Sequence, residues 1–152
     1  MEDKISVMYS EEEIDKRIRE LGKQISEEYA GESIHMVCVL KGASTFACEL
    51  AKRITVPVIL DFMQVSSYGS QTVSSGTLKV KKELDEPIEG DNVIIVEDII
   101  DSGNTLSRLV PMLQERNPKS LKVCTLLDKP ERREVDYDQN YRNLPYVGVL
   151  NL

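Results

Sequence analysis

The sequence has few of the residues that build metal centres. Its 152 residues include three cysteines, Cys38, Cys48 and Cys124, and a single histidine, His35. The cysteines lack the paired short spacings of a zinc site, so we expect reduced thiols packed in the interior. A histidine without a second one to join it is more often packed or solvated than catalytic. We therefore expect no chemical role for His35.

Long apolar runs and an excess of basic residues are also missing. No segment approaches the eighteen or so uninterrupted apolar residues of a membrane-spanning helix, and the N-terminus has neither a basic leader nor an apolar stretch. We expect a cytoplasmic protein without a membrane partner. Nineteen Lys and Arg stand against 26 Asp and Glu, a formal net charge of −7. This charge gives no general attraction for nucleic acid, so an anionic ligand must be held by local charge.

Length and composition indicate one folding unit. Hydrophobic residues make up 41% of the chain and charged residues 30%, the balance of an ordinary globular protein. A domain typically takes about 150 residues. We predict a single domain over residues 1–152, without internal repeats or an interdomain linker.

Apolar spacing predicts alternating helices and strands. Ser10 to Glu13 has the S-x-x-E form of a capping box, and apolar residues then recur at helical spacing, which predicts a helix that ends near Gly31. Further strands are predicted at 34–40, 56–65, 77–82, 92–97 and 121–127, and further helices at 44–54 and 105–116. This alternation predicts an α/β fold with a parallel sheet. The stretch 66–76, rich in Ser, Gly, Thr and Gln, predicts an excursion from the sheet.

The segment VIIVEDIIDSGNT at 93–105 combines a buried strand, several acids and a turn into a helix. Ligands of open α/β sheets bind at the carboxyl ends of such strands. The backbone N–H groups of the turn, the hydroxyls of Ser102 and Thr105 and the helix dipole form a phosphate cradle, and Gly103 permits close approach. The neighbouring carboxylates suit sugar hydroxyls, a divalent cation or a proton in transit. These carboxylates belong to Glu97, Asp98 and Asp101.

The run VEDIIDSGNT resembles the phosphoribosyl-diphosphate binding motif of the type I phosphoribosyltransferases. Other segments are similar, in the same order, to bacterial hypoxanthine phosphoribosyltransferases. They are VLKGA at 39–43, DFM at 61–63, SSYG at 66–69, LLDKP at 126–130 and YRNLPY at 141–146. The resemblance implies the type I phosphoribosyltransferase fold, a central mainly parallel sheet flanked by helices, with a small partial hood.

The resemblance also implies a reaction and its participants. The expected enzyme transfers the 5-phosphoribosyl group from phosphoribosyl diphosphate to a 6-oxopurine base in purine salvage. Hypoxanthine gives IMP, guanine gives GMP, and pyrophosphate is released. Mg²⁺ is the expected cofactor, and the expected assembly is a homodimer or homotetramer.

Each matching residue acquires an implied role. Asp101 is implied as the general acid/base at purine N7. Glu97 and Asp98 are implied to hold the ribose 2′ and 3′ hydroxyls, directly or through Mg²⁺, and Asp136 to coordinate Mg²⁺. The remaining implied contacts are Lys41, Gly42 and Arg142 with pyrophosphate, Ser67 and Tyr68 in a lid at about 66–76, and Ser102, Gly103, Asn104 and Thr105 with the 5′-phosphate. In this family the peptide bond before Lys41 can be cis.

The sequence departs from the family pattern between Val135 and Asp136. In relatives a further strand and loop supply the aromatic residue that stacks on the purine and the lysine that reads its 6-oxo group. No residue inherits either role here. Either the segment is deleted from this protein, or it belongs to the natural chain and is absent from this sequence. A true deletion removes several kcal/mol of purine affinity while phosphoribosyl diphosphate still binds.

Two alternative functions stay open at this stage. One is a nucleotide-sensing regulator with this fold that binds RNA, which the net charge of −7 disfavours. The other is transfer to xanthine or to a pyrimidine, since the segment that selects the base is missing.

Overall fold

The computed structural model describes residues 9–67, 78–100, 104–128 and 145–151. Three helices and six strands lie within them. In chain order these are α1 (Glu11–Glu28), β1 (Ile34–Val39), α2 (Ser44–Lys52), β2 (Val58–Ser67), β3 (Leu78–Lys82), β4 (Asn92–Ile100), α3 (Asn104–Gln114), β5 (Ser120–Asp128) and β6 (Pro145–Asn151). Across the described ranges, none of the helices is long and apolar enough to cross a membrane.

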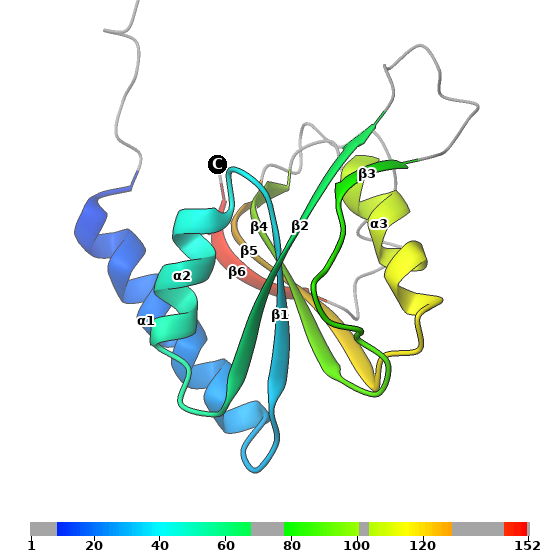
Figure 1. Ribbon diagram of the computed structural model, residues 1–152. Helices are drawn as coiled ribbons and strands as arrows, with labels where there is room; N and C mark the ends of the chain where they lie inside the picture. Colours follow the sequence, from blue (N-terminus) through cyan, green and yellow to red (C-terminus); the bar gives the residue numbers. More distant parts are fainter. Residues whose placement is uncertain (1–8, 68–77, 101–103, 129–144, 152) are drawn as a thin grey trace, which may run out of the picture.

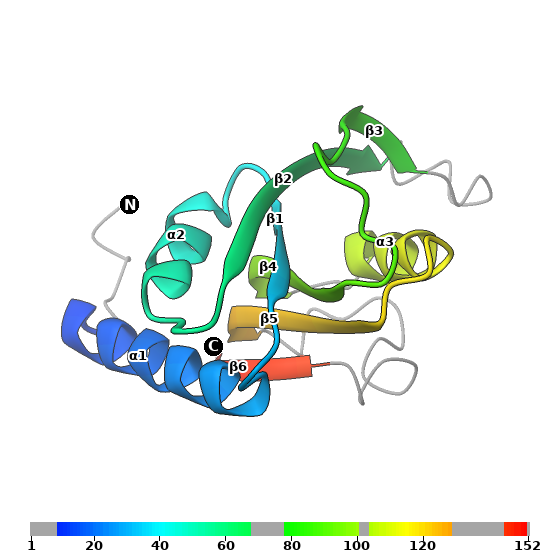
Figure 2. The same cartoon turned by 60° about the horizontal axis from the view of Figure 1, so that its bottom comes forward.

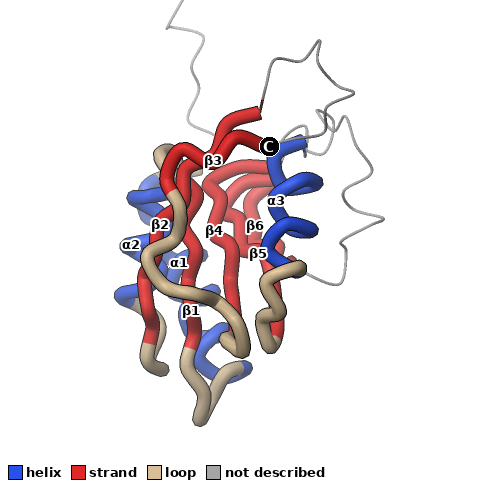
Figure 3. The backbone as a smooth tube through the Cα atoms, turned by 45° about the vertical axis from the view of Figure 1, so that its right-hand side comes forward, coloured by secondary structure: helices blue, strands red, loops and turns tan. Residues whose placement is uncertain are grey.

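The six strands form one sheet in the order β3-β2-β1-β4-β5-β6 (Figure 1). All neighbouring strands are parallel except β2 and β3, which are antiparallel. Helices α1 and α2 cover one face, and α3 covers the other (Figure 2, Figure 3). The predicted α/β fold, a mainly parallel sheet flanked by helices, is confirmed.

Strand β1 shows why the sequences of the central strands are continuous apolar runs. All six of its residues are buried, because helices cover both faces of a parallel sheet. Met36 and Cys38 pack into the cluster formed with α1 and α2. Val37 and Val39 pack into the cluster formed with α3. Side chains of a strand alternate between faces, so one short strand serves both halves of the core.

Helix α1 begins where the capping box predicts. The Ser10 hydroxyl accepts the N–H of Glu13 at 3.0 Å, and the Glu13 carboxylate accepts the N–H of Ser10 at 2.8 Å. The reciprocal bonds satisfy two donors that the first helical turn leaves unpaired. Ile18, Leu21 and Ile25 are buried against the sheet.

Several boundaries and one burial prediction differ from the sequence reading. Strand β4 runs to Ile100, and not to Glu97 as predicted, because it pairs with β5 as far as Ile100 and Asp128; Asp98 therefore lies within the strand rather than after it. Strand β6 was not predicted. Cys38 and Cys124 are buried free thiols as expected, but Cys48 is exposed, since it lies on the outer side of α2.

Candidate active site

The predicted site lies at the carboxyl ends of β1 and β4. These neighbouring parallel strands pair from His35 with Val93 to Cys38 with Val96. The chain leaves β1 through Lys41 and Gly42, and the Leu40–Lys41 peptide bond is cis, in agreement with the resemblance. The sheet register thus brings this loop beside the acids that follow Val96.

Gly42 lies directly against one of these acids. A Cβ added at Gly42 would lie 2.8 Å from Oδ2 and 3.3 Å from Cγ of Asp98. Such a separation is shorter than a carbon–oxygen van der Waals contact. A residue without a side chain is therefore needed for the loop and the carboxylate to keep these positions.

The loop is held in place by its own neighbours. The Lys41 carbonyl accepts the Ser44 hydroxyl at 2.8 Å and the Ser44 N–H at 3.1 Å. The Leu40 N–H donates to the carbonyl of Met63 in β2 at 2.8 Å. The Lys41 side chain is exposed, so its ammonium group can meet an anion. The sequence reading missed the part played by Ser44, although a serine at a helix start is a signal for such bonding.

Glu97 and Asp98 are half-buried on β4. Their charges act on Cys38 of the neighbouring strand: burial, as the largest cause, and the charges of Cys48, Glu97 and Asp98 together raise the pKa of that thiol to about 11. Burial raises the pKa of the Cys124 thiol to about 12. Both buried thiols are protonated at neutral pH and are poor nucleophiles.

A cavity of about 770 Å³ opens at this end of the sheet, and Gly42 and Asp98 contribute to its wall. Its other lining residues come from α1, α2 and β5 and are Glu11, Glu12, Ile14, Asp15, Ile18, Thr45, Phe46, Glu49 and Leu126. Carboxylates dominate the polar part of this lining. An anionic ligand held there needs compensating positive charge, which Lys41 or a divalent cation can supply.

The donor set fits Mg²⁺. Glu97 and Asp98 offer hard carboxylate oxygens, and Mg²⁺ characteristically binds through one or two carboxylates together with water and substrate oxygens. Asp98 lies within the loop contact described above, so a cation bound by it would lie beside Lys41–Gly42.

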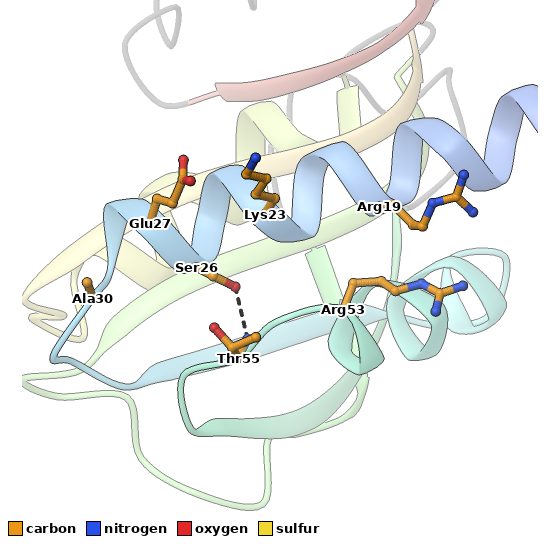
Figure 4. Close-up of a pocket in the computed structure, with 7 residues that line it drawn as sticks. All are labelled: Arg19, Lys23, Ser26, Glu27, Ala30, Arg53 and Thr55. Atoms are coloured by element: carbon orange, nitrogen blue, oxygen red, sulfur yellow. Dashed lines mark hydrogen bonds between the residues drawn. The ribbon is translucent and has the colours of Figure 1, made fainter.

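A second cavity of about 510 Å³ lies between α1 and the end of α2 and is a weaker candidate (Figure 4). Arg53 donates to Asp15 at 2.9 Å and lies 3.8 Å from Glu49, and Arg19 also pairs with Asp15. The Ser26 hydroxyl accepts the Thr55 N–H at 2.9 Å. The guanidinium groups of Arg19 and Arg53 therefore already have carboxylate partners.

The structure brings part of the predicted site together. Gly42 and Asp98 are in contact, and Lys41 and Glu97 flank them in the chain. Thr105 lies in the first turn of α3 and is half-buried. Ser67 ends β2 and Asn104 begins α3. The remaining predicted residues lie outside the described ranges and are Tyr68, Asp101, Ser102, Gly103, Asp136 and Arg142.

Comparison with known proteins identifies a family that this chain matches. Residues 8–147 match the phosphoribosyl transferase domain family. The hypoxanthine phosphoribosyltransferase of Salmonella typhimurium is 46% identical over an alignment that covers 100% of this chain and 98% of that protein. A bifunctional protein of Listeria innocua, named TilS/HprT, is 47% identical over 95% of this chain, which spans only 26% of that protein.

A solved structure agrees with these sequence matches. A hypoxanthine-guanine phosphoribosyltransferase from Bacillus anthracis superposes with a TM-score of 0.81 at 48% identity, covering 87% of this chain and 78% of that one. The Salmonella alignment extends over 175 residues whereas this chain has 152. At least 23 aligned positions therefore have no counterpart in this chain.

Proposed function

Since this chain belongs to the phosphoribosyl transferase family, we propose that it transfers the 5-phosphoribosyl group from phosphoribosyl diphosphate to hypoxanthine or guanine. The observation that carries the proposal is the packing of the Lys41–Gly42 loop on Asp98, at the carboxyl ends of two neighbouring strands. It joins a cationic, backbone-rich loop to a carboxylate pair, and the reaction requires both. The full-length relative and the solved structure named above as hypoxanthine phosphoribosyltransferases support the choice of base and do not favour the RNA-binding alternative.

The proposed reaction exchanges one bond at the anomeric carbon. Purine N9 forms a bond to C1′ while the bond from C1′ to the pyrophosphate oxygen breaks, and pyrophosphate leaves with the bonding electrons. The ribose carbon passes through a state that resembles an oxocarbenium ion. Asp101, as general acid/base, accepts the proton of purine N7 as N9 bonds to C1′, so that N9 carries more electron density and the bonded base is neutral.

The other proposed roles follow from charge and geometry. Lys41 with the backbone of Gly42, and Arg142, bind the pyrophosphate. Residues 102–105, of which Asn104 and Thr105 begin α3, bind the 5′-phosphate, because the backbone N–H groups and the dipole at a helix start favour an anion. Ser67 and Tyr68 belong to a proposed lid that excludes water and so favours transfer over hydrolysis.

Mg²⁺ is the proposed cofactor. When bound, it neutralises pyrophosphate oxygens and so makes pyrophosphate a better leaving group. Glu97 and Asp98 hold the ribose hydroxyls directly or through the ion, and Asp136 is proposed as a further ligand. The assembly is proposed to be a homodimer or homotetramer in the cytoplasm, without membrane or nucleic-acid partners.

We place the missing positions of the alignment in one segment between Val135 and Asp136, within a single domain. The 23 or more unmatched positions support this interpretation. The resemblance implies that this segment contacts the base, so its loss should weaken purine binding more than binding of phosphoribosyl diphosphate.

The proposal is tested by intact mass spectrometry of the purified protein, followed by absorbance assays with Mg²⁺ and phosphoribosyl diphosphate. Hypoxanthine, guanine, xanthine and a pyrimidine are compared as acceptors, and EDTA provides the metal-free control. We expect IMP and GMP formation that depends on Mg²⁺. A faster reaction with xanthine or the pyrimidine would overturn the choice of base.

The mass determines how the assay is interpreted. A protein heavier than 17.2 kDa that makes IMP contains the base-contacting segment. A protein of 17.2 kDa that binds phosphoribosyl diphosphate without turnover is a shortened, sugar-phosphate-binding relative, and the proposed transfer reaction is then wrong for it.

A further inference from the structure

The single histidine has carboxylates at both ring nitrogens. Nε2 of His35 lies 3.0 Å from Oδ2 of Asp61, and Nδ1 lies 3.0 Å from Oδ2 of Asp91. The ring is 1% exposed. It lies on the face of β1 that also carries Val37 and Val39, below the core shared with α3. None of the proposed catalytic steps uses these three residues.

Asp61 is an acceptor only. Its Oδ1 accepts the N–H groups of Phe62 at 2.9 Å and Asp85 at 3.0 Å, and its Oδ2 accepts the N–H of Glu86 at 3.1 Å. Burial acts to raise the pKa of Asp61, but the hydrogen bonds from Asp85, His35, Glu86 and Phe62 outweigh it and hold that pKa below its usual value. The carboxyl is therefore ionised, and Nε2 of His35 must carry a proton.

Nδ1 of His35, the second ring nitrogen, also faces a carboxylate and must also carry a proton. The Asp91 side chain is 39% exposed, and an aspartate in contact with water is ionised at neutral pH. A neutral imidazole has one N–H and one lone pair. It would turn that lone pair toward a carboxylate oxygen 3.0 Å away, without water between them. A ring with protons on both nitrogens satisfies both carboxylates.

We propose that His35 is an imidazolium at neutral pH and fastens both ends of the connection 83–91 to the sheet. Asp61 binds the ring and the N–H groups of Asp85 and Glu86, just after β3. Asp91 binds the ring at the other end, just before β4. Figure 3 shows this connection running along the sheet from β3 to β4.

The surroundings make the cluster a pH-sensitive one. Around the ring, two carboxylates oppose one cation, and Lys82, a further cation at this end, binds the Phe62 carbonyl and Asp85. The other charged groups at this end form pairs of their own, Glu83 with Arg116 and Glu32 with Lys119, or are exposed, as Glu86 and Glu89 are. Removal of the ring proton leaves one carboxylate facing a lone pair.

The sign of the pH dependence follows from proton linkage. A free histidine loses its proton near pH 6.5, so above this pH the unfolded chain binds fewer protons at residue 35 than the folded chain does. The contribution of the protonated ring to stability is then fully present below about pH 6.5 and is lost as pH rises. The folding equilibrium constant should decrease by up to about tenfold per pH unit.

Nuclear magnetic resonance tests the protonation state directly. In ¹⁵N-labelled protein without an affinity tag, the single histidine gives one set of ring signals in a two-bond ¹H–¹⁵N correlation spectrum. At pH 7.5 we expect both ring nitrogens of the folded protein to be protonated, and the unfolded chain in urea to show mainly neutral ring. An unprotonated ring nitrogen in the folded protein at pH 7.5 would overturn the proposal. Neither result depends on enzymatic activity.

Asp91→Asn provides the matched variant, because the asparagine amide can donate to Nδ1 of a neutral ring. We expect this variant to show a neutral ring with its proton on Nε2 at pH 7.5. Its urea unfolding midpoint should not fall between pH 6 and 8, whereas the wild-type midpoint does. Glu89→Gln, an exposed change in the same connection, should behave as wild type. An imidazolium and a wild-type pH dependence in Asp91→Asn would contradict the proposal. The scan stops at pH 8 to avoid the titration of cysteine thiols above it.

Discussion

At residue 42, the absence of a side chain determines where a carboxylate can lie. Gly42→Ala would place a methyl group 2.8 Å from Oδ2 of Asp98. The obstructing atom is the end of a side chain, so the carboxylate can move aside at a small cost in stability. A shift of about 1 Å at a reacting centre is enough to slow a reaction about 100-fold. We therefore expect Gly42→Ala to lower kcat/KM by about 10- to 100-fold. Steady-state assays together with a thermal unfolding curve check this separation of effects.

A double-mutant cycle with Asp98→Ala shows whether the methyl group acts through that carboxylate. In the Asp98→Ala background, Gly42→Ala should cost much less activity than it does in the wild type. Equal losses in both backgrounds would mean that the methyl group disturbs the loop itself, and the proposed contact would then not be the cause.

Asp101 is the residue whose replacement should separate binding from transfer. Asp101→Asn keeps the size of the side chain and removes the charge that, in the proposed mechanism, accepts the proton of purine N7. We expect phosphoribosyl diphosphate binding by calorimetry to stay near the wild-type value, while IMP formation falls by about 100-fold or more. Full activity in the variant would refute the acid/base role.

At the scale of elements, α1 packs tightly against the end of α2 at Gly22. A Cβ there would lie 2.4 Å from Cβ and 2.9 Å from the carbonyl oxygen of Arg53, the C-cap of α2. Alanine adds up to about 1 kcal/mol of helix propensity. Overpacking against a backbone carbonyl costs about 1–3 kcal/mol. Gly22→Ala should therefore lower the free energy of unfolding, by about 1–2 kcal/mol in urea titrations.

Gln24→Ala is the control for that change, because Gln24 lies on the exposed side of the same helix. It should alter the unfolding free energy by less than about 0.5 kcal/mol. If Gly22→Ala were as harmless as Gln24→Ala, α1 and α2 would not pack as closely in solution as they do in this structure.

Elements with a local signal could be predicted from the sequence, and the others could not. The capping box at Ser10 and the apolar run of β1 predicted α1 and β1 within a few residues. The predicted end of β4 at Glu97 was wrong, because pairing with β5 extends the strand through Asp98 to Ile100, against the low preference of aspartate for strands. Among the described strands β6 pairs with β5 alone, so its formation depends on that partner strand rather than on a local signal.

At the scale of the whole molecule, the site exists because β1 lies beside β4. Fifty-five residues separate Gly42 from Glu97 along the chain, and apolar periodicity contains no information on strand order. The resemblance to a family implied a mainly parallel sheet, which the structure confirms, and the structure supplies the order of its strands. The contact between Gly42 and Asp98, and the bonding of Ser44 to the loop, depend on atomic positions that a sequence pattern does not specify.

Carboxylates held ionised by the fold also determine how the whole molecule responds to acid. Hydrogen bonding to Arg116 lowers the pKa of Glu83, and the bonds to Asp61 outweigh its burial and lower its pKa as well. Carboxyls with a depressed folded pKa stabilise the fold above their unfolded values of about 4 and lose that contribution as pH falls through the folded values. The urea unfolding midpoint should thus fall steadily below about pH 4.5. Arg116→Gln removes the partner that lowers the pKa of Glu83, so it should make the decline of the midpoint with falling pH less steep. The control, Glu115→Gln, changes an exposed residue and should leave the steepness unchanged. A decline of equal steepness in both variants would show that Glu83 contributes nothing to it.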